Sequence, residues 1–335
     1  MFIAYFICLS LLLLAGVSCC SAAVRKLLQY HHHNNITTMG KKGKKAQAGK
    51  AKKLTPKEIG KKLDVLVKKL EEELKGADLF TPLPPTEDCA ICCLPLSRVF
   101  GKSAYNACCQ NWICTGCERG HGEFIMLQNE RGKRSTPHTC PFCRAPEPST
   151  VEEYARQLES RALENDISAC FTLAAMILSG EHDGVPGVPE DKLKALELCI
   201  RAADLGSPEA CSSIASYYQE GTLIPRSLER ATLLDRVGAV RGSIISRHGI
   251  GIFEYYDAGN HELGIRHWKI AAEGGMQLSL DELKKIYLAH GKMHGKECIG
   301  KEYLNKLYRM CHAAQEAVKS EGREKDDEED TIYKC

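Results

Sequence analysis

The chain has 335 residues, enough for two or three domains, and a net charge of only +2. Its 44% apolar and 26% charged residues are typical of an ordinary soluble protein. The eighteen cysteines would fit a disulfide-rich secreted protein, but eight of them fall in one paired cluster and the others are scattered. This distribution argues against a disulfide framework and indicates a reducing compartment.

Residues 1–24 form a hydrophobic segment in which Phe2–Val24 has no charged residue. Small residues at Ser21–Ala23 offer a cleavage site, so one interpretation is a secretory signal peptide, although the usual basic start is missing. A second is an uncleaved membrane anchor, because the segment is long enough to span a bilayer. Arg25 and Lys26 then place the rest of the chain on the cytoplasmic face of the membrane. A third is a mistranslated upstream exon. Without an anchor, we expect a cytoplasmic protein.

Residues 25–54 form a basic, low-complexity linker that has almost nothing to bury, so we expect it to be disordered. Residues 25–75 carry fifteen Lys or Arg and five acidic residues. We interpret the linker as a solvated spacer, with a tether to anionic lipid or a nucleic-acid patch as alternatives. Nucleic-acid binding by Lys41–Lys62 ranks last, because the run lies outside any folded module and lacks interleaved aromatic residues.

An amphipathic helix is predicted over residues 55–76. Thr55, Pro56 and Glu58 form a capping box with proline in the first turn. An apolar stripe follows, with lysines off it, at Ile59, Leu63, Leu66, Leu70 and Leu74. Such a stripe pairs with a second copy as a coiled coil or packs on a neighbouring domain, and we favour packing.

Four cysteine pairs lie within residues 86–147. Three are C-x-x-C pairs, Cys89–Cys92, Cys114–Cys117 and Cys140–Cys143, and the fourth is the adjacent pair Cys108-Cys109. A C-x-x-C pair lets two thiolates of one turn reach the same ion, and eight thiolates suffice for two tetrahedral zinc ions. The segment is too short for a strong core, so the sequence predicts a domain that zinc binding folds.

This cluster resembles a RING finger, a family in which pairs one and three bind one ion and pairs two and four the other. The resemblance assigns the first zinc ion to Cys89, Cys92, Cys114 and Cys117, and the second to Cys108, Cys109, Cys140 and Cys143. The adjacent pair departs from the common Cys-x-His and is similar to all-cysteine, U-box-like variants. Alternatives to Cys108 are Cys93, His121 and His138.

RING fingers mostly act as ubiquitin ligases that dock a ubiquitin-charged conjugating enzyme without forming a covalent intermediate. The resemblance implies that Ile91 is the apolar docking residue, Pro141 the docking proline and Arg144 the arginine that bridges conjugating enzyme and ubiquitin. Trp112 and Phe124–Leu127 are either further contact residues or the core of the module. A ubiquitin-conjugating enzyme is therefore an expected partner.

Residues 150–318 are predicted to form helical repeats. Three segments end at Gly206, Gly242 and Gly275, which recur after 36 and 33 residues. A partner helix precedes each segment, and a fourth begins near Leu280. These helices are predicted to end at glycines that fit the left-handed cap position, namely Gly180, Gly221, Gly259 and Gly291. Helix pairs at this period are typical of an α-solenoid, here with three repeats and a partial fourth. The scattered cysteines Cys170, Cys199, Cys211 and Cys311 lie in this helical sequence, where a free cysteine acts as a small apolar residue.

The repeats resemble Sel-1-like repeats, which are relatives of tetratricopeptide repeats. The resemblance rests on Leu173-Ala174, the Gly184–Asp191 loop, Lys194–Leu196 and Ala202–Gly206, and it returns at Trp268 and Ala271-Ala272. It implies an adaptor surface for a protein substrate or peptide. Tyrosines on the first helices either line that surface or pack between helices: Tyr217, Tyr218, Tyr255, Tyr256 and Tyr287.

The predicted architecture is a small zinc-stapled RING domain followed by an all-α solenoid, with an acidic, disordered tail at residues 319–335. We expect a ubiquitin ligase whose zinc finger recruits the conjugating enzyme and whose repeats recruit the substrate. The alternative is a non-enzymatic scaffold that uses both modules only for protein contacts.

Overall fold

The computed structural model describes residues 54–98, 102–130, 138–182, 185–289, 292–293, 296–297 and 299–316. The hydrophobic segment 1–24, the acidic tail 319–335 and all of the basic linker except Leu54 lie outside the described residues.

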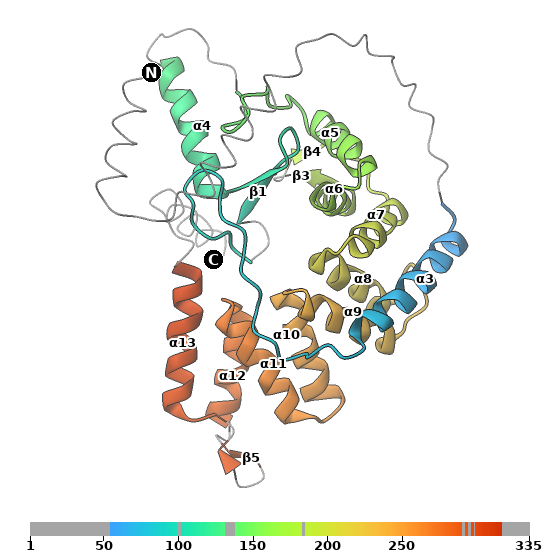
Figure 1. The fold of residues 1–335 in the computed structure, drawn as a ribbon, viewed down its shortest axis with the longest axis vertical. Helices are drawn as coiled ribbons and strands as arrows, with labels where there is room; N and C mark the ends of the chain where they lie inside the picture. The colour runs from blue at the N-terminus through green and yellow to red at the C-terminus, as the bar shows by residue number, and fades with distance from the viewer. Residues whose placement is uncertain are drawn as a thin grey trace. The chain divides into compact units, whose positions relative to one another are not determined.

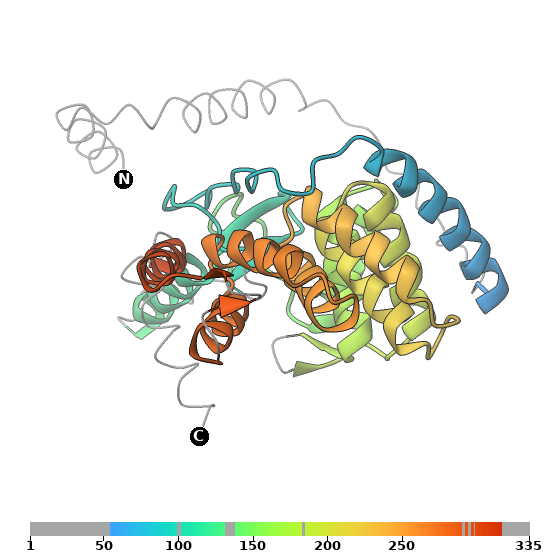
Figure 2. The same cartoon turned by 90° about the horizontal axis from the view of Figure 1, so that it is seen from below.

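Helix α3 (Pro56–Leu74) begins with the predicted capping box, in which Thr55 and Glu58 each accept a hydrogen bond from the other's backbone N–H. Its apolar stripe is buried against the repeats, on helices α7 (Lys192–Asp204) and α9 (Leu228–Val240). Figures 1 and 2 both show the blue α3 beside these helices. The stripe is therefore covered by a neighbouring domain of the same chain.

Ion pairs border the buried stripe of α3 along both helices that it contacts. Lys62 pairs with Glu197 of α7 at 2.7 Å, and Asp64 pairs with Arg230 of α9 at 2.8 Å. Near the end of α3, both Glu73 carboxylate oxygens accept hydrogen bonds from Arg241 at 2.7 and 2.8 Å. The first two pairs are exposed and contribute little energy, so they mainly fix the register in which α3 lies, whereas the Arg241 guanidinium is largely buried and binds Glu73 through two hydrogen bonds.

The cysteine module, residues 86–147, contains one small antiparallel hairpin and one helix. Strands β1 (Ser103–Asn106) and β2 (Asn111–Cys114) pair with Tyr105 opposite Trp112. Helix α4 (Thr115–Glu130) continues directly from β2. Among the described residues of the module, one small buried cluster contains Cys89, Leu96, Ile113 and Cys114, so half of it consists of the paired cysteines.

The repeats are antiparallel helix pairs that follow a leading helix, α5 (Val151–Leu163). The pairs, in chain order (Figure 1), are α6 (Ile167–Ser179) with α7, α8 (Pro208–Glu220) with α9, α10 (Ile244–Ile252) with α11 (His261–Glu273), and α12 (Gln277–Ala289) with α13 (Lys301–Glu316). A short π-helical turn, η2 (Phe253–Asp257), extends α10. The described residues thus form an all-α, solenoid-like array after the cysteine module.

A hairpin whose strands have two residues each connects the two helices of the first pair, and another connects those of the last pair. Strands β3 (Glu181–His182) and β4 (Val185–Pro186) lie between α6 and α7, and β5 (Lys292–Met293) and β6 (Lys296–Glu297) lie between α12 and α13. Gly180 and Gly221 end α6 and α8 in the left-handed conformation, as predicted from their positions after the apolar runs.

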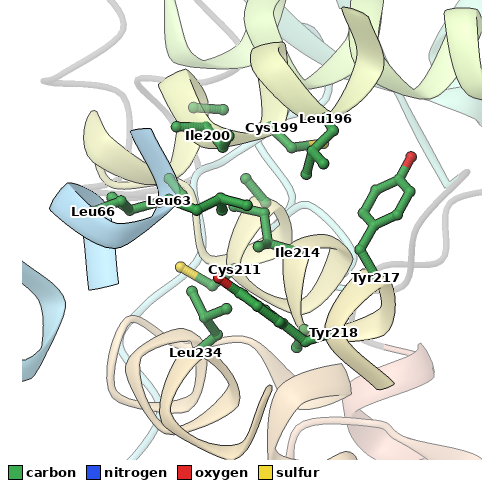
Figure 3. Close-up of a cluster of buried hydrophobic side chains, with 14 of the residues drawn as sticks. Leu63, Leu66, Leu196, Cys199, Ile200, Cys211, Ile214, Tyr217, Tyr218 and Leu234 are labelled. Carbon is green, nitrogen blue, oxygen red and sulfur yellow. The ribbon is translucent and has the colours of Figure 1, made fainter. Parts of the chain in front are cut away.

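Small side chains let neighbouring helices of the array approach closely. Gly238 of α9 shows the requirement, because a Cβ atom there would lie 2.4 Å from the hydroxyl of Ser246 on α10. The scattered cysteines Cys170, Cys199, Cys211 and Cys311 are all buried, as expected for small apolar residues. Figure 3 shows Leu63 and Leu66 of α3 completing the cluster that contains Cys199, Cys211 and Ile214.

The connection between α3 and the cysteine module is held against the repeats rather than looping away from them. Arg247 of α10 is fully buried and donates hydrogen bonds to the carbonyl oxygens of Leu79 at 2.7 Å and Thr81 at 3.0 Å. Phe80, between them, lies under the guanidinium of Arg266, 3.6 Å from its ring centre. This linker strap, residues 75–85, therefore occupies part of the repeat surface.

Removing a buried side chain of α3 should destabilise the repeats. Leu70 is completely buried, so Leu70→Ala should lower the free energy of unfolding by about 2–5 kcal/mol in urea denaturation. Val65 on the same helix is 70% exposed, and Val65→Ala should cost less than about 0.5 kcal/mol. Equal effects of the two substitutions would show that α3 does not pack on the array.

Candidate metal centre

The structure brings the eight paired cysteines into two groups of four. One group is Cys89, Cys92, Cys114 and Cys117, and the other is Cys108, Cys109, Cys140 and Cys143. Within each group all sulfur atoms lie within 4.8 Å of one another. These are the groups that the interleaved assignment predicts, so each could hold one metal ion.

The first and last C-x-x-C pairs have the same backbone geometry. In the first, the N–H of Cys93 donates to the carbonyl of Cys89 at 2.9 Å, and the N–H of Cys89 donates to Leu94 at 2.8 Å. In the last pair, the N–H of Arg144 donates to the carbonyl of Cys140 at 2.9 Å, and the N–H of Cys140 donates to the carbonyl of Ala145 at 2.8 Å. Each turn thereby points two sulfurs toward one place.

In both turns the residue after the second cysteine is left-handed, with φ of 56° at Cys93 and 61° at Arg144. Cys93 is exposed and outside both groups of sulfurs. Its position matches that of Arg144, so it belongs to the turn and not to the ligand set. The structure therefore gives no support to Cys93 as a substitute for Cys108.

The adjacent pair Cys108-Cys109 lies in the turn that connects β1 to β2. The carbonyl of Asn106 accepts hydrogen bonds from the N–H groups of Cys109 and Gln110, and Gln110 takes a left-handed φ of 59°. This tight turn separates the two neighbouring side chains enough for both sulfurs to join Cys140 and Cys143. Cys108 thus lies in the group to which the RING resemblance assigned it.

The sulfur separations suit a tetrahedral ion. Zinc–sulfur bonds of about 2.3 Å place the sulfurs of a tetrahedron about 3.8 Å apart. The separation is 3.9 Å between Cys92 and Cys114 and 3.8 Å between Cys109 and Cys140. Cys108 and Cys143 are closer, at 3.4 Å, and no disulfide joins cysteines in the described ranges. The spacing is that of ligands around an ion, not of a covalent bridge.

The acid–base chemistry of the groups also fits a cation. Burial would raise the pKa of Cys89, but hydrogen bonds from the backbone N–H groups of Cys92, Cys114 and Ile91 bring it down to about 7. Burial and neighbouring sulfurs raise the pKa of Cys117 and of Cys108. Four thiolates in one site repel one another, whereas a divalent ion would stabilise all of them.

One buried polar atom without a hydrogen-bond partner indicates a thiolate in the second group of sulfurs. The side-chain oxygen of Asn106 faces the Cys140 sulfur at 3.7 Å, while its Nδ2 is buried without a hydrogen-bond partner. Exchanging the two ends of this amide would direct an N–H toward the sulfur, which is the arrangement that a metal-bound thiolate accepts.

The two histidines weighed as substitute ligands have other roles. The Nε2 atom of His121 on α4 lies 2.8 Å from the carbonyl oxygen of Thr139 and so braces the last cysteine turn against the helix. His138 faces the carboxylate of Glu147 at 3.7 Å. Neither joins a group of sulfurs among the described residues.

The residues assigned to conjugating-enzyme contact lie at the surface of the module. Ile91 is 42% exposed, Arg144 is exposed, and Pro141 is half-buried. On α4, Phe124, Met126 and Leu127 are at least half exposed, whereas Ile125 is buried. Part of the apolar run on α4 is therefore available for contact.

Trp112 instead belongs to the contact between the cysteine module and the repeats. Its indole N–H donates to the hydroxyl of Ser168 on α6 at 3.0 Å. The neighbouring Tyr105 donates to Asp166, the residue that caps α6, and Tyr154 of α5 donates to the carbonyl of Tyr105 at 2.6 Å. Burial and the Asp166 carboxylate raise the pKa of Tyr105.

Arg161 of α5 reaches the turn that carries the adjacent pair Cys108-Cys109. Its guanidinium donates to the carbonyl oxygens of Ala107 at 2.8 Å and Cys108 at 3.0 Å. We call the residues that make this contact the module–repeat seam: Tyr105, Trp112, Tyr154, Arg161, Asp166 and Ser168. Sequence reasoning missed the seam, because no periodicity or motif marks a polar side chain that acts across separate domains.

The tyrosines on the first helices of the repeats divide between the two roles expected for them. Tyr217 and Tyr218 are buried in the core, whereas Tyr256 is 60% exposed. The Tyr255 ring contacts Tyr256 edge-on and Trp268 at a tilt, with ring centres 4.9 and 5.2 Å away. Most of this aromatic surface thus packs between helices.

No family model and no curated protein matches the chain. Solved structures to which it is similar include a Sel1 repeat protein from Oxalobacter formigenes (22% identity over 58% of this chain and 71% of that chain; TM-score 0.42). A protective antigen of uropathogenic Escherichia coli with an SLR fold is 19% identical over 59% of this chain but only 39% of its own length, with TM-score 0.41. An immunity protein of Pseudomonas aeruginosa is 18% identical over 51% and 78% of the two chains, with TM-score 0.33.

Within the described ranges, no helix has the length and apolar character needed to cross a bilayer. The hydrophobic segment 1–24, which carried the signal and anchor interpretations, is not among those residues.

The two groups of sulfurs predict the metal content of the protein. Native mass spectrometry of reduced, full-length chain should find two zinc ions, and Cys108→Ser should retain one, because it removes a ligand from the second group alone. Cys93→Ser should retain both. Wild-type protein without stoichiometric metal would contradict the assignment.

The seam predicts that one metal site depends on the repeats. Arg161→Ala should weaken zinc binding at the second group by about tenfold in a competitive chelator titration, because the turn that carries Cys108 loses its support. Arg156→Ala is the control, since Arg156 lies on the same helix and is exposed. Unchanged affinity in the Arg161 variant would separate the seam from metal binding.

Proposed function

We propose that the cysteine module is a RING-type zinc finger and that the protein is a ubiquitin ligase, with its substrate recruited by Sel-1-like repeats. The observation that carries this proposal is the interleaved grouping of sulfurs, in which pairs one and three meet and pairs two and four meet. Simple zinc turns use consecutive pairs, so interleaving is the more specific sign of the RING arrangement.

The surface of the module supports the proposed docking of a conjugating enzyme. Ile91 lies inside the first of the two equivalent turns, and Arg144 directly follows the last cysteine of the second. Both side chains are exposed. The exposed apolar residues of α4 would enlarge this surface. Zinc would act as a structural ion here, holding the two turns in place.

The chemistry proposed for this chain is positioning. Ile91 and Pro141 would hold the conjugating enzyme by apolar contact, and Arg144 would bridge that enzyme and ubiquitin. A planar guanidinium presents several N–H donors in a fixed fork, so it restricts the thioester to fewer orientations than a lysine would. Restricting a thioester to attack geometry lowers the entropic part of the barrier without a covalent intermediate.

The repeats would supply the partner. Sel-1-like repeats are adaptor surfaces by resemblance, and the array described here leaves Leu178, Ile245, Ile252 and Tyr256 exposed on first helices. The module–repeat seam would hold the conjugating enzyme in a fixed relation to a bound substrate. A fixed relation would limit which lysines of the substrate can be reached.

A non-enzymatic scaffold is the second proposal, because the same seam and repeats would serve protein contacts without ligase activity. Reduced cysteines would require a reducing compartment, so we propose that the module lies in the cytoplasm, whether or not residues 1–24 anchor it to a membrane. Nucleic-acid binding stays the weakest proposal, since Lys62 of the basic run is paired with Glu197.

Autoubiquitination with a panel of conjugating enzymes tests the ligase proposal. Wild-type protein should be active with at least one enzyme, and Ile91→Ala should reduce the rate by about tenfold or more, since it removes a buried apolar contact of the complex. A chain that is silent with every enzyme, yet contains two zinc ions, would favour the scaffold.

Arg144 needs a variant that keeps its left-handed backbone. Arg144→Gly removes the guanidinium while glycine accepts the positive φ, so a loss of activity would report on the side chain. Cys93→Gly makes the same backbone change in the equivalent turn and should leave the rate unchanged. Equal rates in both variants would remove Arg144 from the proposed mechanism.

A further inference from the structure

A cavity of about 240 Å³ lies among the end of α8, helix α9 and the α10–η2 segment. At about 30 Å³ per water molecule it has room for a medium-sized side chain. Its apolar lining residues include Leu228, Ile250 and Phe253, and its polar ones are Gln219, Thr232, Asp235 and Asp257. Among the described residues, no lysine, arginine or histidine lines the cavity.

Asp235 is an acid buried without a cationic partner. It is 6% exposed, and no ion pair within the described residues includes it. Burial raises the pKa of Asp235 to about 7, and the nearby Ser246 hydroxyl only partly opposes that rise. The buried Glu254 on η2 differs, because Arg236 and Asn260 bind it at 3.1 and 2.7 Å. A buried acid is costly unless it is paired, so Asp235 needs an explanation that Glu254 does not.

The repeats themselves show that this acid is unusual. When the second helices are aligned on Gly206, Gly242 and Gly275, Asp235 shares its position with Cys199 in one repeat and Trp268 in another. Both of those residues are buried in apolar cores. One repeat thus has a short, charged side chain where its neighbours have apolar ones, and a cavity lies beside it.

The π-helical turn η2 borders the same cavity. Its first and last residues, Phe253 and Asp257, both belong to the lining. Single π turns inside helices are rare and frequently occur at functional sites. This backbone irregularity is independent of the buried acid and falls in the same place.

We propose that this cavity binds a lysine side chain of a partner protein. The apolar lining residues suit the methylene stem of lysine, and the ammonium group would meet the buried Asp235, with the exposed Asp257 also in the lining. A compact ammonium suits a single buried carboxylate, whereas a guanidinium is a planar group with five donors to satisfy. The proposal rests on the partner-binding role of the repeats, but it does not require ligase activity.

Methyl NMR of the full-length chain can test the proposal, because the methyl groups of Leu228, Ile250 and Ile252 report on the cavity. The probe is a capped Gly-Lys-Gly peptide, with its Nε-acetylated form as the neutral match and Gly-Arg-Gly as the second cation. The lysine peptide should shift these methyl signals, and the acetylated peptide should not. Equal shifts with the acetylated peptide, tighter binding of the arginine peptide, or no shifts at all would overturn the proposal.

Two variants localise the effect. Asp235→Asn keeps the shape of the side chain and should weaken binding of the lysine peptide by at least about tenfold, without lowering the melting temperature. Asp257→Asn, at an exposed position, should weaken it by a few-fold. Glu229→Gln removes a charge from α9 outside the cavity and should change nothing. Wild-type affinity in both Asp variants would also overturn the proposal.

Discussion

The cysteine module depends on support from outside its own side chains. Its buried cluster contains Leu96 and Ile113 beside cysteine sulfurs, which is too little apolar surface for an independent core. Two further supports compensate: the grouping of thiols around two places, and the seam against α5 and α6. Because Arg161 binds the carbonyl of Cys108, the second group of sulfurs and the leading helix share one structural unit. Removing that contact would therefore disturb the candidate metal site and the leading helix together.

The spacing of residues in the sequence was sufficient to predict the local parts of this structure. The capping box at Thr55, the helix ends at Gly180 and Gly221 and the grouping of the eight cysteines follow from short-range rules. The roles of Arg161 and Arg247 could not be predicted, because each side chain binds carbonyl groups 53–168 residues away in the sequence. Those partners become neighbours only after the chain folds. The left-handed turn at Cys93 is an intermediate case, since its equivalence to Arg144 emerges only from comparing two distant turns.

The linker strap alters how the repeats can serve as an adaptor. Arg247 and Arg266 are engaged by Leu79, Phe80 and Thr81, so this part of the surface already holds an extended segment of the same chain. A partner there would have to displace a segment that is tethered at both ends and therefore has a high effective concentration. The cavity beside Asp235 has no such internal occupant among the described residues, which makes it the more accessible place for a partner.

Helix α3 crosses from the second helix of one pair to the second helix of the next. Its contacts to Glu197 and Arg230 fasten it to α7 and α9 separately, so sliding one pair past the other would break one set of contacts. Stacked helix pairs otherwise contact only their neighbours, so such an array can bend along its length. With α3 in place, the first two pairs are braced as a block, and the linker strap that continues from α3 ties the third pair to it through Arg247 and Arg266.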